Sequence, residues 1–106
     1  MPTTDDGSST ERLNRIKDTL LQSKSELATT YSVKSLGVFG SFVRGEQNEA
    51  SDIDILVEFT ETPGLIDFIA LENYLSETLG TKVDLVMRDS LKPTIGERIL
   101  QEVVPV

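Results

Sequence analysis

The 106-residue chain contains no cysteine, no histidine and no tryptophan. Without cysteine there is no disulfide framework and no zinc-thiolate site. Without histidine, the Ser-His-Asp and Cys-His arrangements of nucleophilic catalysis are excluded as well. If the protein is an enzyme, its chemistry must rest on carboxylates, hydroxyls, lysine, arginine or a hard metal ion.

Long apolar runs are also lacking. No stretch approaches the roughly 20 apolar residues that a membrane-spanning helix needs. The first ten residues, MPTTDDGSST, are polar and acidic, unlike a signal peptide. We therefore expect a cytoplasmic protein that makes no contact with a membrane.

Positive charge is scarce, because 10 Lys and Arg stand against 18 Asp and Glu, for a net charge of −8. Such a surface repels the phosphate backbone of a nucleic acid, and no cluster of Lys and Arg in the sequence offsets the repulsion. We expect no direct binding of nucleic acid, and a basic protein partner suits this charge better. The alternative is that the charge only keeps the protein soluble.

The patterning of apolar residues predicts an α/β fold in a single domain, with elements in the order α-β-α-β-α-β-α and a small mixed sheet flanked by helices. Residues 1–8 are predicted to form a flexible tail and residues 9–106 the folded domain. We expect helices at about 9–29, just after Gly40, at 65–79 and after Pro93, and strands at 33–40, 52–59 and 82–87. The predicted core residues of these strands are Leu36, Val38, Ile53, Ile55, Val57, Leu85 and Val86.

Two aspartates interrupt an apolar run, Asp52-Ile53-Asp54-Ile55-Leu56-Val57. On a strand their side chains leave the same face, roughly 6–7 Å apart at the backbone. Two carboxylates this close repel, so such a pair either takes up a proton or recruits a cation. The simple alternative is a solvated strand face. An EF-hand loop is excluded, because Val57 and Pro63 stand where that loop needs glycine and glutamate.

A third aspartate, Asp84, lies within the apolar run of the next predicted strand. If that strand pairs beside 52–59, Asp84 stands about 5 Å from one of the first two aspartates. Three converging carboxylates would form an all-oxygen site of the kind that holds Mg²⁺. Two such ions can clamp the attacking and leaving oxygens of a phosphoryl or nucleotidyl transfer.

Gly40 and Ser41 close one predicted strand and open a helix. Free backbone N–H groups and the positive end of the helix dipole favour an anion at such a position, and glycine allows its close approach. The loop is not a Walker A motif, because the G-x-x-x-x-G-K-[ST] string is missing. Taken alone, it reads as a simple turn with Ser41 as the helix N-cap. Ten residues separate Ser41 from Asp52, so a phosphate cradle and a metal site would lie at the same edge of the sheet.

The composite pattern, G-S, ten residues, D-x-D and a third aspartate one helix and one strand later, resembles the nucleotidyltransferase superfamily related to DNA polymerase β. The strings GSFVRG and SDIDILV, and the C-terminal LKPTIGERILQEVVPV, resemble the minimal nucleotidyltransferases of prokaryotes over about residues 12–106.

The resemblance implies a role for each motif position. Gly40 and Ser41 would hold the β- and γ-phosphates of ATP, and Asp52, Asp54 and Asp84 would bind Mg²⁺, two ions being expected. Asp84 would also act as the base for the incoming hydroxyl. Arg44 would either reach a phosphate or pair with an acidic residue to hold the turn, and we favour the second role.

The resemblance also implies a partner. Larger relatives carry extra helical domains that bind the acceptor, and a chain of this length has no room for one. Minimal relatives are often antitoxins of HEPN ribonuclease toxins, which implies transfer of AMP from ATP to a tyrosine of such a toxin. Two alternatives stay open: neutralisation of the toxin by binding alone, and transfer of a nucleotide to a small molecule.

Overall fold

A computed structural model describes residues 4–40 and 52–106 of the chain, with side chains from residue 11 onward. Its elements are α1 (Thr4–Tyr31), β1 (Val33–Phe39), β2 (Ile53–Phe59), α3 (Leu65–Leu79), β3 (Val83–Met87), a 3₁₀ turn η1 (Arg88–Ser90), α4 (Pro93–Glu102) and β4 (Val104–Pro105). The predicted α/β fold is confirmed. The short helix predicted just after Gly40 lies outside the described residues.

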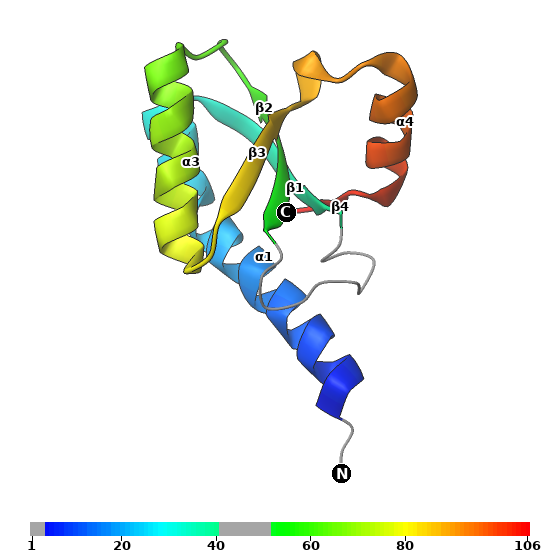
Figure 1. Ribbon diagram of the computed structural model, residues 1–106. Coiled ribbons are helices and arrows are strands. Elements are labelled where there is room, and N and C mark those ends of the chain that lie inside the picture. The colour runs from blue at the N-terminus through cyan, green and yellow to red at the C-terminus, as the bar shows by residue number, and fades with distance from the viewer. Residues whose placement is uncertain (1–3, 41–51) are drawn as a thin grey trace.

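The four strands form one mixed sheet in the order β3-β2-β1-β4. β2 runs antiparallel to β1 and parallel to β3, and β4 pairs antiparallel with β1. Figure 1 shows α1 and α3 on one side of this sheet and α4 on the other. In the described residues, no helix is both long and apolar enough to cross a membrane.

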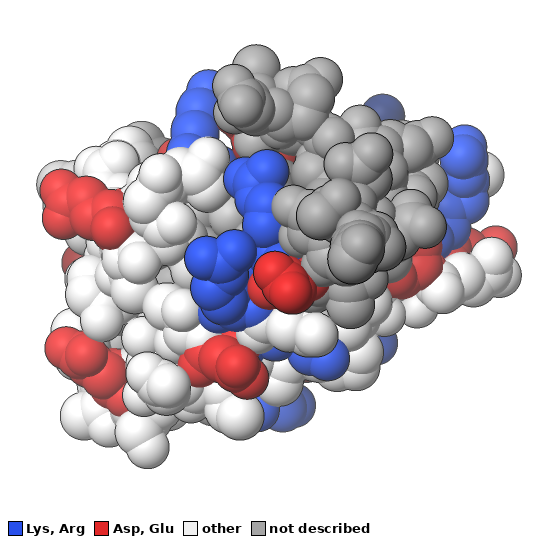
Figure 2. Space-filling view, turned by 90° about the horizontal axis from the view of Figure 1, so that it is seen from below, with Lys and Arg blue, Asp and Glu red and all other residues white. Residues whose placement is uncertain are grey.

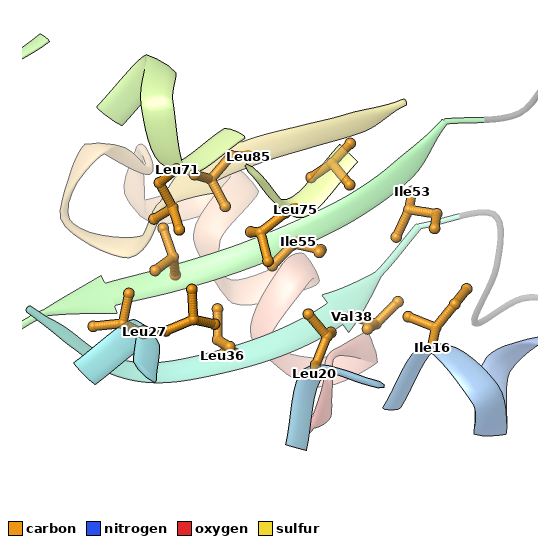
Figure 3. Packing of buried hydrophobic residues seen from close by; sticks show 13 residues of the cluster. Ile16, Leu20, Leu27, Leu36, Val38, Ile53, Ile55, Leu71, Leu75 and Leu85 are labelled. Carbon is orange, nitrogen blue, oxygen red and sulfur yellow. The ribbon is translucent and has the colours of Figure 1, made fainter. Parts of the chain in front are cut away.

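The core lies between the sheet and the pair α1 and α3 (Figure 3). Alternate residues of each strand enter it, because successive side chains of a strand point to opposite faces. Leu20 and Leu27 from α1 and Leu71 and Leu75 from α3 meet them and are completely buried. The cluster comprises Ile16, Leu20, Leu27, Val33, Leu36, Val38, Ile53, Ile55, Val57, Leu71, Leu75, Val83 and Leu85.

The prediction was wrong for one of the core residues. Val86 pairs with Leu56 on the opposite face of the sheet and is half-buried. Its neighbours in the sequence explain the prediction, since the apolar run does not reveal which face each residue takes. The other six predicted residues belong to the core cluster.

The ends of the chain also differ from expectation. α1 begins at Thr4 rather than at about residue 9, so residues 4–8, predicted as part of a tail, lie in the helix. Acidic residues are favoured in the first turn of a helix as well as in tails, and composition alone does not separate the two. At the other end, β4 was not predicted, because a strand of 2 residues leaves no alternating pattern.

β4 fixes the position of α4. After α4 the chain pairs with β1, and the amide of Val106 donates a 3.0 Å hydrogen bond to the carbonyl of Leu36. A Cβ placed on Gly37 would overlap the side chain of Val103, so this glycine allows the junction of α4 and β4 to approach the sheet. The last turn of α4 is thereby held against the end of β1.

Candidate active site

Asp54 lies at the centre of the candidate site. It pairs with Phe39 of β1 on one side and with Asp84 of β3 on the other. Residues paired across neighbouring strands share a face of the sheet, so Asp54 and Asp84 lie side by side on the face opposite the core. Asp54 is half-buried and Asp84 is exposed. β3 therefore pairs beside β2, which was the condition for Asp84 to lie next to one of the first two aspartates.

Gly40 follows Phe39 and brings the backbone against Asp54. Its φ of +83° lies in the left-handed region, where residues with a side chain are strained. A Cβ at this position would also overlap the carboxylate of Asp54. Glycine is therefore required twice here, for the turn and for the close approach of its backbone to the Asp54 carboxylate.

Asp52 precedes β2, two residues before Asp54, and 42% of its side chain is exposed. One of its carboxylate oxygens lies 3.9 Å from Nζ of Lys82, whose side chain is 78% exposed. At this distance and exposure the pair contributes little to stability. Asp52 therefore lies at the rim of the site, held only loosely.

A bound divalent cation is implied by the motif, and the donor set can be tested against it. Asp52, Asp54 and Asp84 offer hard oxygen donors from one edge of the sheet, which is the ligand type that Mg²⁺ prefers. Across the described residues, however, no three Asp, Glu, His or Cys side chains lie close enough to hold a metal ion together. The residue types fit Mg²⁺, and Asp54 and Asp84 share a face of the sheet, although the three carboxylates are not gathered around one point among the described residues.

The structure adds two residues that the sequence did not suggest, Arg98 and Glu102 of α4. The amide of Gly40 donates a 3.0 Å hydrogen bond to Oε2 of Glu102. Both new residues line a hollow of about 320 Å³ together with Phe39, Gly40, Asp54, Ile95 and Ile99. The sequence predicted the helix after Pro93, but no sequence signal ties Glu102 to a glycine 62 residues earlier.

Ser41 and Arg44 lie outside the described residues, so their predicted roles at the phosphates stay predictions. Figure 2 views the molecule from the end where β1 ends and β2 begins. Lys and Arg side chains gather toward the middle of this view, although the chain as a whole carries a net charge of −8.

Comparison with known proteins places these features in context. Residues 19–106 match the family model described as nucleotidyltransferase domain. Protein adenylyltransferase MntA of Thermococcus cleftensis is 52% identical over 92 residues, which cover 87% of this chain and 93% of that protein.

Solved structures of related proteins also superimpose on this chain. A candidate minimal nucleotidyltransferase superimposes with a TM-score of 0.72 at 34% identity, covering 92% of this chain and 95% of that one. A chain of a toxin–antitoxin complex with AMP-PNP gives a TM-score of 0.65 at 26% identity, covering 87% of this chain and 69% of that one.

Proposed function

Because this chain belongs to the nucleotidyltransferase domain family and is a nucleotidyltransferase, we propose that it transfers AMP from ATP to a tyrosine hydroxyl of a HEPN ribonuclease toxin and thereby acts as an antitoxin. The related adenylyltransferase and the related toxin–antitoxin chain support this assignment. The net charge of −8 agrees with a partner whose own surface binds RNA.

One observation carries the proposal: Gly40, free of a side chain, packs on Asp54, and Asp54 lies in register with Asp84. A phosphate held at the Gly40 amide would lie next to the carboxylates. Nucleotidyl transfer needs the phosphates and the metal ligands in this proximity, because its catalysis consists mainly of positioning and charge neutralisation.

In the proposed reaction the tyrosine oxygen attacks the α-phosphorus of ATP. A new P–O bond forms, the bond to the β-phosphate oxygen breaks, and pyrophosphate leaves. Asp84, the most exposed of the three aspartates, would accept the hydroxyl proton. Asp52, Asp54 and Asp84 would hold two Mg²⁺ ions, which supply charge neutralisation at the attacking and leaving oxygens.

A second candidate function is neutralisation by binding alone. Three large apolar side chains stand exposed near the start of α3: Leu65 at 74%, Ile66 at 83% and Ile69 at 45%. Such a patch suits a protein interface. Under this alternative the toxin is captured as a stable complex, and the aspartates are not needed for protection.

The deciding experiment is intact-mass spectrometry of the cognate HEPN protein after incubation with this protein, ATP and Mg²⁺. We expect mass gains in steps of one AMP, which disappear with the Asp52→Asn/Asp54→Asn variant. Asp89→Asn is the matched control, because this exposed aspartate in η1 lies apart from the site. An unchanged mass together with a stable complex would favour capture.

A further inference from the structure

The backbone amide of Gly40 already binds an anionic oxygen. Its partner is Oε2 of Glu102, at 3.0 Å, in the last turn of α4. Glu102 is half-buried and Gly40 is buried. A carboxylate oxygen on a backbone N–H reproduces the charge and geometry of a phosphate oxygen, so Glu102 occupies the position that an anionic ligand of this amide would take.

Arg98 lies one helical turn before Glu102, on the same side of α4, because residues four apart in a helix are neighbours. It lines the same hollow as Gly40 and Asp54 and is the cationic residue among the described lining residues. Across the part of the chain that the structure describes, Arg98 forms no hydrogen bond or ion pair, not even with Glu102. Five guanidinium donors are thus available beside an amide that binds anions and a carboxylate expected to bind metal.

We propose that α4 forms part of the nucleotide site: Arg98 binds the phosphates of ATP, and Glu102 holds the Gly40 amide until a phosphate displaces it. The inference rests on the proposed function, since it assumes that ATP occupies the hollow beside Asp54. Glu102 then keeps a buried donor satisfied in the absence of ligand, which avoids the cost of an unpaired amide. It also competes with the ligand, both for this amide and by charge repulsion.

The size of the hollow agrees with this assignment. About 320 Å³ lies between α4 and the ends of β1 and β2, which falls in the range of small-ligand pockets. Its polar groups converge from two directions, with Gly40 and Asp54 on the sheet side and Arg98 and Glu102 on the helix side. A ligand bound there would bridge the helix and the sheet.

The test measures ATP affinity by titration calorimetry in the presence of Mg²⁺, without toxin, so that binding is separated from transfer. Arg98→Gln should weaken ATP binding roughly tenfold, because it removes hydrogen bonds from a charged donor. Arg98→Lys should restore part of the loss. Arg88→Gln is the matched control, since Arg88 pairs with Glu58 and does not line this hollow.

The second pair of variants tests the competition. Glu102→Gln keeps a side-chain acceptor for the Gly40 amide but removes its charge, and it should tighten ATP binding at least about threefold. Glu97→Gln removes the same charge from an exposed position of α4 outside the hollow and should leave the affinity unchanged. Thermal unfolding of all variants verifies that each is folded.

The outcomes separate this inference from the proposed function. If the wild-type protein binds no ATP with Mg²⁺, the proposed function fails and the inference with it. If it binds ATP but Arg98→Gln matches Arg88→Gln, or Glu102→Gln binds no more tightly than Glu97→Gln, the inference is overturned and the proposed function stands. A weaker affinity for Glu102→Gln would assign Glu102 to tethering α4 instead.

Discussion

The two faces of the sheet differ in chemistry although the same strands form both. On the face toward α1 and α3, Ile53, Ile55 and Val57 are buried at 1% exposure or less. On the opposite face, the intervening Asp54 and Glu58 are half-buried. α4 lines the hollows over β1 on that second face, and Asp84 of the edge strand β3 stays exposed.

This difference shows how a small chain combines a stable core with a reactive site. Three alternate residues of β2 pack into the core, and Asp54 and Glu58 carry charge because their side chains leave the other face. Leu56 shares that second face and is itself buried. The core face fixes the strand register, and a slip by one residue would bury the aspartates. The position of Asp54 beside Asp84 is therefore a consequence of the apolar residues on either side of it.

The largest expected effect on the charged face of the sheet comes from Asp54→Asn. We expect AMP transfer to fall by at least about 10³-fold, because a neutral side chain no longer supports metal-dependent charge neutralisation worth several kcal/mol. The free energy of unfolding should change far less than the activity, since asparagine has nearly the same size and shape as aspartate. Activity assays and denaturant unfolding on the same samples check both halves. A variant that retains transfer would remove Asp54 from the proposed mechanism.

The converse variant acts on the core face. Leu20→Ala should lower the free energy of unfolding by about 2–5 kcal/mol, because Leu20 is completely buried in the cluster and its truncation leaves a cavity. Leu21→Ala is the matched control on the same helix, since Leu21 is 58% exposed, and we expect a change below about 0.5 kcal/mol. Equal effects in urea unfolding would contradict the assignment of the core to this side of α1.

Gly80 and Gly40 both have positive φ, but only Gly40 is crowded by a neighbour. Comparing their alanine variants therefore separates the cost of backbone strain from the cost of crowding at the site. Gly80→Ala, at φ +70° with open space around it, should cost roughly 1 kcal/mol, the penalty for a left-handed alanine. Gly40→Ala, at φ +83°, should cost more, because its Cβ must also displace the Asp54 carboxylate. It should also weaken ATP binding, whereas Gly80→Ala should not. Chemical unfolding and nucleotide titration of both variants test this, and identical behaviour would show that strain alone acts at Gly40.

The sequence alone predicted the features that depend on a local pattern of residues. Alternation predicted the face of Asp54, and the apolar run around Asp84 indicated the strand that pairs with β2. Asp52, predicted for the same strand, precedes it. The sequence did not predict the contacts between segments that are far apart in the chain. β4 exists through its pairing with Gly37 and Val38, and Glu102 reaches Gly40 only because β4 returns the chain to β1. Contacts of this kind depend on tertiary packing and leave no periodic signal.

The smallest expected effect concerns the rim of the second face. Lys82→Gln removes the partner of Asp52, but the 3.9 Å separation and the 78% exposure of Lys82 predict a change in the free energy of unfolding below about 0.5 kcal/mol. Mg²⁺ affinity, measured by titration, should rise slightly, because Asp52 no longer shares its charge with a lysine. A marked loss of stability would mean that this pair anchors the start of β2. A loss of Mg²⁺ affinity would mean that Lys82 positions Asp52 rather than competing for it.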